Sequence, residues 1–581
     1  MSVESIITEN LDVWTSAIKT KSTSGRGSSN KLELYGIKKL RELILELAIR
    51  GKLVPNDYAD FSLKEHLSQL NAARLNLIES GALKKTKTQL PVSADEQFFE
   101  IPANWKWLRL ADVYDVRDGT HDSPKPVESG YPLVTSKNLS SGKLDLSDVK
   151  YISEIDHKKI IERSKVDFGD ILFAMIGSIG NPVIVDQTVE FSIKNVALFK
   201  YFDYEQSCPE YLKYYLVFAS KVFKEQSSGG VQPFVSLGKL RAFTIPYPPL
   251  NEQIKIVEKL NDLMALCDEL ELQTEASIEA HQTLVKSLLE TLTNAKDADE
   301  LNESWQRISE HFDVLFTTED SIDQLKQTIL QLAVMGKLVK QDPNDEPASK
   351  LLERIAAEKE QLIKDKKIKK QKPLPSISDE EKPFDLPEGW GWMSLSEIGV
   401  FSGGKTPSKS NGAYWNGSIP WVTPKDMKVD RVYDSEDHVT QLAVNDGLMK
   451  IEPESILLVA RSGILRRRFP IAITKTVCTV NQDLKVLNLI DKKLSEYVLL
   501  MMKGFERFII ENLTKVGTTV ESLKFDEFSV CPFILPPFNE QERIVTRVEE
   551  LLVLCDSLKE KLKVRNGTQL KISDALVSSA T

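Results

Sequence analysis

The residues with the most recognisable chemical potential form a phosphate-binding pattern. Residues 399–406 read Gly-Val-Phe-Ser-Gly-Gly-Lys-Thr and match the GxxxxGK(S/T) spacing of a P-loop, whose backbone amides hold nucleotide phosphates. A P-loop must open a helix at its Lys-Thr pair, so that the helix amides point at the phosphates. Here Pro407 follows, and then Ser-Lys-Ser-Asn-Gly, which cannot start a good helix. We therefore interpret 399–406 as a polar loop that holds no nucleotide.

Other catalytic patterns fail on their own chemistry. Residues 535–538 (Leu-Pro-Pro-Phe) end like the Asn/Asp-Pro-Pro-Tyr/Phe motif of amino-methyltransferases, but a leucine cannot accept the hydrogen bond of an amine. Residues 380–382 (Glu-Glu-Lys) have the spacing of a nuclease motif, in a charged stretch without a strand. The six histidines show no metal-ligand spacing. The sequence therefore predicts neither a catalytic site nor a metal site.

Basic side chains offer a different chemistry, the binding of nucleic acid. Arg461 and the run Arg466-Arg467-Arg468 follow an apolar segment, and arginine can bind a phosphate or the O6/N7 edge of guanine with two hydrogen bonds. The lysine-rich stretches at 84–87 and 364–372 are more typical of solvated linkers.

A net charge of −10 disfavours a nucleic-acid partner for the chain taken as a whole, but the charge is unevenly distributed. Residues 250–340 hold eight Lys and Arg against eighteen Asp and Glu, so this one segment carries a charge equal to that of the whole chain. The segments at 100–245 and 385–535 are close to balanced. A protein partner suits the acidic segment better than a phosphate backbone does.

The elements that must position these residues are repeated along the chain. The segment 40–54 returns at 325–339, an offset of 285 residues, and Pro-Pro-Leu-Asn-Glu-Gln at 248–253 returns as Pro-Pro-Phe-Asn-Glu-Gln at 536–541. The stretches 115–240 and 400–525 differ at nearly every polar position. These offsets predict two diverged copies of one unit. Two similar frames around two dissimilar inserts suggest one mechanical role and two ligand specificities.

The frame has the apolar spacing of helices. Large apolar residues recur at alternating intervals of four and three, which is typical of a coiled-coil seam. Asn251 and Asn539 precede Glu-Gln and suit a helix start. The pattern favours packing within the chain, and we also expect partner proteins to bind these helices. The seam residues are Ile256, Leu260, Leu263, Cys267, Ile544, Val548, Leu551 and Cys555.

The inserts have the pattern of mixed sheets. Residues 170–177 and 455–460 are short apolar runs bounded by turn residues, which predicts buried strands. Helices are expected at 210–223 and 492–508. The fold class is therefore α+β, with two globular mixed α/β domains that are separated and flanked by long antiparallel coiled-coil-like helices in a pseudo-two-fold repeat.

The whole chain resembles the specificity subunit of type I restriction–modification enzymes. The residues that carry the resemblance are the two Pro-Pro-x-Asn-Glu-Gln motifs, Ile-Pro-Ala-Asn-Trp-Lys-Trp at 101–107, Leu-Pro-Glu-Gly-Trp-Gly-Trp at 386–392, and the Gly-Gly-Lys-Thr-Pro…Tyr-Trp…Ile-Pro-Trp pattern at 403–421. The order frame–insert–frame–insert–frame agrees with that family.

The resemblance implies a non-catalytic chain that reads an asymmetric bipartite site in double-stranded DNA through two target recognition domains. It also implies docking of two adenine-N6 methyltransferase subunits and, through them, restriction/translocase subunits. S-adenosylmethionine, ATP and Mg would be used by those partners, and this chain would hold no cofactor. Scattered cysteines without a CxxC pair, and the lack of a long apolar run or signal peptide, predict a cytoplasmic protein. The resemblance implies that the cell is bacterial or archaeal.

The expected boundaries follow from the repeat and the resemblance. They are 1–98 for an N-terminal helical frame, 99–248 for target recognition domain 1, 249–383 for a central helical spacer with a basic linker, 384–535 for target recognition domain 2, and 536–581 for a C-terminal frame. The residues predicted to bind DNA are Thr120, His121, Lys125, Lys137, Asn138, Gln232, Lys405, Thr406, Lys425, Arg461, Arg466, Arg467, Arg468 and Thr518.

Two other functions are weighed against this one. A self-sufficient enzyme such as a fused methyltransferase requires a cofactor loop and a catalytic motif, which the sequence does not supply. A coiled-coil scaffold whose inserts bind proteins would share the frame but not the sequence-specific binding of DNA.

Overall fold

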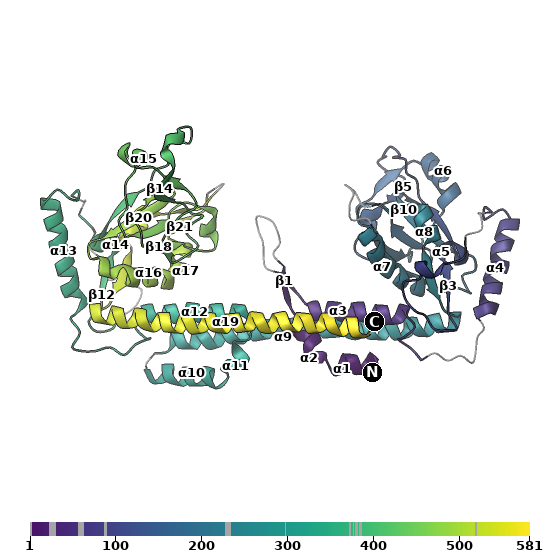
Figure 1. Ribbon diagram of the computed structural model, residues 1–581, viewed down its shortest axis with the longest axis horizontal. Coiled ribbons are helices and arrows are strands. Elements are labelled where there is room, and N and C mark those ends of the chain that lie inside the picture. Colours follow the sequence, from purple (N-terminus) through teal and green to yellow (C-terminus); the bar gives the residue numbers. More distant parts are fainter. Residues whose placement is uncertain are drawn as a thin grey trace. The chain divides into compact units, whose positions relative to one another are not determined.

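The computed structural model describes residues 3–21, 31–55, 63–85, 90–226, 234–296, 298–370, 373–375, 377, 382, 386–517 and 520–580. The chain divides into two units, one of Met1–Ser277 with Arg565–Thr581 and the other of Ile278–Val564. Each unit combines long helices with one mixed domain of strands and helices (Figure 1), so the expected mixture of helix and strand in two repeated domains is confirmed. Over the described residues, every helix is too short or too polar to span a membrane.

The first insert domain is built on two sheets. One has the strand order β4-β10-β7-β8 and the other the order β6-β5-β9. The elements are β3 (Lys106–Arg109), α5 (Leu110–Val113), β4 (Tyr114–Asp118), β5 (Tyr131–Val134), η2 (Ser136–Leu139), β6 (Lys150–Ile152), α6 (Glu154–Ser164), β7 (Ile171–Ala174), β8 (Gly180–Ile184), β9 (Ser192–Ile193), β10 (Val196–Tyr201), α7 (Pro209–Gln226), α8 (Leu237–Ala242) and β11 (Thr244–Tyr247).

The second insert domain repeats this plan with strand orders β13-β20-β17-β18-β15 and β16-β14-β19. Residues 399–403, expected as part of a polar loop, are a strand instead, because they pair with the apolar strand β20. The elements are β12 (Gly391–Ser394), α14 (Leu395–Ile398), β13 (Gly399–Gly403), η4 (Gly412–Tyr414), β14 (Trp415–Val422), β15 (Arg431–Val432), β16 (His438–Val439), α15 (Gln441–Asn445), β17 (Ile456–Val459), η5 (Gly463–Arg466), β18 (Ile471–Thr474), β19 (Thr479–Val480), β20 (Leu484–Leu489), η6 (Lys492–Leu494), α16 (Ser495–Gly504), α17 (Glu506–Asn512), β21 (Thr514–Lys515), β22 (Ser522–Leu523), α18 (Phe525–Val530) and β23 (Pro532–Leu535).

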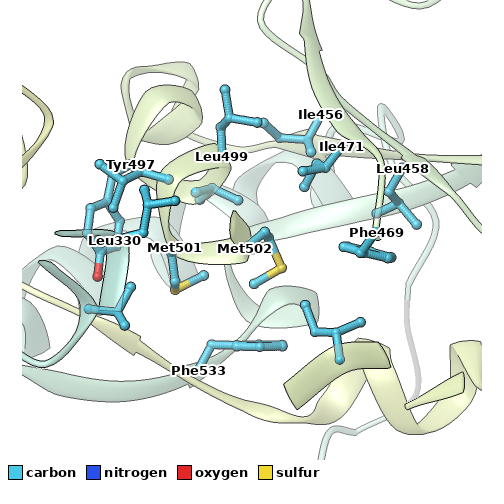
Figure 2. Close-up of a cluster of buried hydrophobic side chains, with 14 of the residues drawn as sticks. Leu330, Ile456, Leu458, Phe469, Ile471, Tyr497, Leu499, Met501, Met502 and Phe533 are labelled. Carbon is cyan, nitrogen blue, oxygen red and sulfur yellow. The ribbon is translucent and has the colours of Figure 1, made fainter. Parts of the chain in front are cut away.

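The expected buried strands are present in both domains. All side chains of β7 and of β17 are buried, because each strand lies inside its sheet and a helix covers the sheet. Figure 2 shows the second core, where Ile456 of β17 lies by Ile471 of β18, Met501 and Met502 of α16 occupy the centre, and Phe533 lies at the bottom. Burial of such apolar side chains contributes about 1.5–3 kcal/mol each.

The entry and exit strands of each domain pair with each other. Strand β3 pairs antiparallel with β11, and β12 pairs antiparallel with β23. The two connections between each insert domain and the frame therefore lie side by side. The polar loops of a domain can differ without changing how the domain joins its helices.

The frame consists of long helices. Arg41 of α3 forms an ion pair with Asp268 of α9 at 2.7 Å, and Lys326 of α12 forms the corresponding pair with Asp556 of α19. That the frame helices pair as a coiled coil remains a prediction. The frame elements are α1 (Val3–Thr8), α2 (Leu11–Ser16), β1 (Lys19–Lys21), β2 (Lys31–Glu33), α3 (Tyr35–Ile49), α4 (Leu63–Glu79), η1 (Ala94–Glu96), α9 (Leu250–Asn294), α10 (Ala298–Glu310), α11 (Phe312–Leu315), α12 (Glu319–Val334), α13 (Ala348–Lys364) and α19 (Phe538–Ala580).

The seam side chains pack inside the chain, which corrects the expectation that partner proteins bind these residues. They are buried because they fill the contacts among the frame helices and the domains, and a buried side chain offers no surface to another protein. Docking on these helices would use their exposed residues. The buried seam residues are Ile256, Leu260, Leu263, Cys267, Ile544, Val548 and Cys555, and Leu551 is half-buried.

The structure extends the repeat toward the N-terminus. Ile-Thr-Glu-Asn-Leu-Asp-Val-Trp at 7–14 corresponds to Ile-Ser-Glu-His-Phe-Asp-Val-Leu at 308–315. Ile7 and Trp14 are buried in the first unit, and Ile308 and Leu315 are buried in the second. The offset of 285 residues does not reveal this match. The first copy contains the paired strands β1 and β2 after residue 14, and the second copy has no equivalent of them among the described residues, so the offset differs on the N-terminal side.

Candidate nucleic-acid interface

The repeated Pro-Pro-x-Asn-Glu-Gln motif joins each domain to its long helix. The indole Nε1 of Trp105 donates to Glu252 at 2.8 Å, and that of Trp390 donates to Glu540 at 3.0 Å. The motif glutamines, at 253 and 541, donate to the carbonyl of the first motif proline at 2.9 and 2.8 Å. The motif that carries the family resemblance is therefore structural, and it leaves recognition to other residues.

The helix start at this motif differs slightly from expectation. Helices α9 and α19 begin at Leu250 and Phe538, one residue before Asn251 and Asn539. The carbonyl of Pro249 accepts the first amides of α9, so the preceding proline residue occupies the cap position.

Each domain contains a loop cluster in which four segments meet. The first loop cluster comprises residues 119–121, 134–138, 175–177 and 193–195, and its centre is the turn between β9 and β10. Because backbone hydrogen bonds join all four segments, their side chains are presented together. The bonds run from the amide of Thr120 to Ile193 (3.0 Å), from Lys194 to Val134 (2.9 Å) and from Met175 to Asn195 (3.3 Å).

The second loop cluster comprises residues 404–406, 422–426, 460–462 and 480–483 and has the same connections. Its central turn, between β19 and β20, is one residue longer than the turn in the first. The bonds run from the amide of Lys405 to Val480 (3.0 Å), from Asn481 to Val422 (3.0 Å) and from Ala460 to Asp483 (2.8 Å).

A glycine permits the close approach in both clusters. A Cβ on Gly119 would lie 2.2 Å from the carbonyl oxygen of Ile193, and a Cβ on Gly404 would lie 2.0 Å from that of Asn481. Both contacts are with backbone, which cannot move aside. The packing of two backbones thus explains Gly404, the last glycine of the pattern that imitates a P-loop.

Polar side chains are paired across the first loop cluster. The His121 ring lies between two oxygens, with Nδ1 at 3.0 Å from Asn195 Oδ1 and Nε2 at 3.1 Å from Asp118 Oδ2. Asp118 is buried and also accepts from Arg163. The buried carboxylate therefore fixes two exposed basic groups at the edge of the domain.

A histidine supports the central turn from below. His157 Nδ1 lies 2.9 Å from the Ser192 hydroxyl of β9, and its ring stacks on Tyr131 of β5 with centroids 3.8 Å apart. Burial lowers the pKa of His157, because the charged ring would lose its water. The uncharged ring packs as part of the wall beneath the turn.

The second loop cluster has an equivalent polar pair and unpaired cations. The Thr406 hydroxyl donates to Gln482 Oε1, and this contact corresponds to the one between His121 and Asn195 in the first loop cluster. Within the described part of the chain, the side chains of Lys405 and Arg461 have no hydrogen-bond or ion-pair partner, and Arg461 is exposed. The cluster therefore presents donors that suit phosphates or base edges.

The structure brings together Thr120, His121 and Lys137 in the first cluster, and Lys405, Thr406, Lys425 and Arg461 in the second. Lys137 pairs with Asp148, and the Lys425 ammonium lies 4.0 Å from the Glu436 carboxylate. Lys125 is exposed. The predictions for Gln232 and Thr518 lie outside the described residues.

Asn138 requires a correction. It is 5% exposed, and its Oδ1 accepts from the amide and the hydroxyl of Thr135 at 2.9 and 3.0 Å. Its Nδ2 donates to the carbonyls of Asp145 and Asp148 at 3.0 and 3.1 Å. Because both ends of the amide are engaged within the loop, Asn138 shapes the cluster and cannot also read a base.

The arginine run separates into three environments. Arg466 Nε donates to Glu521, which is 2% exposed, so this guanidinium is held in a fixed orientation. Arg467 is exposed and lines a hollow with Gln327 of α12 and residues of α17, and its contact with DNA remains a prediction. Arg468 is exposed.

Sequence reasoning missed the partners of the predicted residues. Asn195, Gln482, Asp118 and Arg163 join the clusters only because separate strands bring them there, and no local motif marks them. Across the described residues, no three His, Cys, Asp or Glu side chains gather where they could hold a metal ion.

Comparison with known proteins agrees with the repeat. The chain matches the family of the type I restriction modification DNA specificity domain twice, over residues 102–280 and 387–565. It is 38% identical to the type I restriction enzyme EcoAI specificity subunit and 36% identical to the EcoEI specificity subunit, both of Escherichia coli, and each match covers 100% of both chains. One solved structure, from work on complex assembly and conformational transition of the type I R-M system, is 16% identical, with a TM-score of 0.45, and covers 83% of this chain and 98% of that one.

These matches confirm the expected resemblance: the chain belongs to the type I restriction–modification DNA specificity family, and it is a DNA-recognition subunit rather than an enzyme.

Proposed function

We propose that this chain reads an asymmetric, bipartite sequence in double-stranded DNA, one half with each insert domain. In the same proposal the frame helices dock two adenine-N6 methyltransferase subunits and, through them, the restriction/translocase subunits. Those partners would supply S-adenosylmethionine, ATP and Mg, and the complex would work in the cytoplasm.

The observation that carries the proposal is the pair of loop clusters. Both use the same backbone connections and the same close-packed glycine, but they present different side chains. Equivalent scaffolds with different polar groups suit two readers of different sequences. The asymmetry of the target follows from the difference between the His121–Asn195 pair and the Thr406–Gln482 pair.

Exposed apolar residues on the long helices support docking of partner proteins. Leu272 of α9 is 69% exposed, and Val553 and Leu554 of α19 are 67% and 59% exposed. Large apolar side chains in water favour a protein contact. The acidic composition of 250–340 disfavours DNA as the ligand of that segment.

The test is to map methylated adenines across the genome of cells that carry this chain with its methyltransferase partner. One asymmetric motif with two fixed halves and a gap is expected. Exchanging residues 400–530 for another insert should change one half alone, and altering the length of the frame helices should change the gap alone. Methylation by the purified chain without a partner, or a motif without a gap, would contradict the proposal.

A further inference from the structure

We infer that Asn195 and Gln482 are specificity-determining residues, each reading an adenine·thymine base pair through its side-chain amide. The inference rests on the proposed function and adds to it a residue and a base for each half-site. Neither amide belongs to a recognisable sequence motif. Each becomes a candidate only through its position in the central turn of a loop cluster.

The amide oxygen is held in the same way in both domains. His121 Nδ1 lies 3.0 Å from Asn195 Oδ1, and the hydroxyl of Thr406 donates to Gln482 Oε1. Among the described residues, neither amide nitrogen has a hydrogen-bond partner, and Gln482 is exposed. Each turn therefore holds an oriented amide with two N–H donors and one free lone pair on its oxygen.

This donor and acceptor pair matches adenine. In the major groove, adenine presents N7 as an acceptor and its N6 amino group as a donor, and an asparagine or glutamine amide can meet both at once. A phosphate oxygen can only accept hydrogen bonds, so a contact with phosphate would leave the free lone pair of the amide oxygen without a donor. An amide whose oxygen is fixed by a neighbour is better suited to a base edge.

The backbone at Asn195 suits an asparagine. Its φ of 54° lies in the left-handed region, which asparagine adopts more readily than most L residues and which glycine would occupy without strain. The buried Asp118, 4% exposed, holds the other side of the His121 ring and so stabilises the orientation of the pair.

Several neighbouring candidates are already occupied, whereas Lys405 and Arg461 have no partner among the described residues. Asn138 has both ends of its amide bonded within its loop, Lys137 pairs with Asp148, and Arg466 pairs with the buried Glu521. Lys405 and Arg461 can only donate hydrogen bonds, so the two amides are the groups that offer a donor and an acceptor together, as the edge of adenine requires.

The experiment uses the full chain in complex with its methyltransferase subunits. Initial rates of methylation are measured on duplexes that carry each of the four bases at every position of both half-sites. In Asn195→Asp the carboxylate cannot donate to N7 but can accept from the N4 amino group of cytosine. The preference for adenine at one position of the first half should fall roughly tenfold to hundredfold in favour of cytosine, with the second half unchanged.

Two further variants distinguish a change in base preference from the effects of misfolding and of an added negative charge. Asn195→Gly suits the positive φ and adds no charge, and it should relax the same position toward all four bases. Gln482→Glu should shift one position of the second half and leave the first intact. Each domain therefore serves as the folding control for the other.

Matched controls carry the same chemical change elsewhere. Asn181 in the first domain also has a positive φ, of 50°, and Gln441 lies on α15 of the second domain. Asn181→Asp and Gln441→Glu should leave every base preference unchanged. If Asn195→Asp and Asn195→Gly both keep the original preferences at every position, the inference for the first domain is overturned. A wild-type complex without a bipartite motif would instead refute the proposed function.

Discussion

The two motif glutamates perform the same role in different surroundings, since Glu252 is partly exposed and Glu540 is buried. Glu252 has both oxygens engaged, by Trp105 and Asn104 at 2.8 Å each. Glu540 is 1% exposed, accepts from Trp390 at 3.0 Å, and among the described residues its other oxygen has no partner. Burial raises the pKa of Glu540, and the bond from Trp390 opposes that rise only in part.

The raised pKa predicts the sign of a pH effect. Folded Glu540 holds its proton to a higher pH than the unfolded chain does, so its contribution to stability is present at low pH and is lost as the pH rises through the folded pKa. Glu540→Gln keeps an oxygen acceptor for Trp390 and removes the charge. Thermal unfolding should show the variant more stable than the wild type by about 1–2 kcal/mol at pH 8, with a smaller difference at pH 4.5.

The matched control is Glu252→Gln. It replaces a carboxylate whose two oxygens are both bonded, so one bond to Asn104 or Trp105 is lost and no stabilisation is expected at either pH. An advantage of Glu540→Gln that is the same at every pH would show that the carboxylate is not protonated on folding.

At the scale of elements, a glycine ends the helix that precedes each domain. Gly51 after α3 and Gly336 after α12 have φ values of 70° and 71°. A Cβ at these positions would lie 2.5 Å from Cγ of Pro102 and 2.6 Å from Cγ of Pro387. The glycine therefore provides both the left-handed turn and the space for the proline that begins the domain.

Alanine at either position should destabilise the protein through both effects. Gly51→Ala and Gly336→Ala should each cost about 3 kcal/mol, part from the positive φ and part from overlap with the proline ring. Gly81→Ala is the control, because Gly81 has a φ of 78° but nothing within 4 Å of its Cβ position. It should cost only about 1–2 kcal/mol. Equal losses in chemical denaturation would rule out the role of the proline contact.

At the scale of the whole molecule, the C-terminal end of the chain completes the first unit. Helix α19 starts in the second unit, and its residues from Arg565 onward belong to the first. There the Tyr35 hydroxyl donates to Asp574 at 2.7 Å, and Asn566 donates to the carbonyl of Ile18 at 3.0 Å. A helix that begins with one copy thus finishes the packing of the other.

A chain that stops after Val564 should therefore lose stability in its first unit. Limited proteolysis should cut residues 1–277 faster than in the full chain, while the second unit keeps its resistance. Asp574→Ala removes only one bonded group and should cost about 1 kcal/mol. Unchanged proteolysis of the first unit in the truncated chain would contradict the shared packing.

The sequence predicted the repeat, the long helices and the buried strands because these depend on local patterns. Apolar spacing near 3.6 residues marks the helices, and the runs at β7 and β17 mark interior strands. It also led to the right family through the Pro-Pro-x-Asn-Glu-Gln motifs, although the structure shows these motifs acting as joints rather than as recognition residues.

Only the tertiary structure decided which polar residues meet. It engaged Asn138 inside its loop, paired Arg466 with the buried Glu521, and placed Asn195 beside His121, which lies 74 positions away in the chain. Such pairings depend on strand register and on glycines that let backbones approach, and neither leaves a periodic signal in the sequence. The sequence by itself determined that the chain has two similar frames and two different inserts, because periodicity and repetition can be read from the order of the residues alone. The groups that face the ligand were determined by contacts between distant segments, because a side chain gains its role from neighbours that only folding supplies.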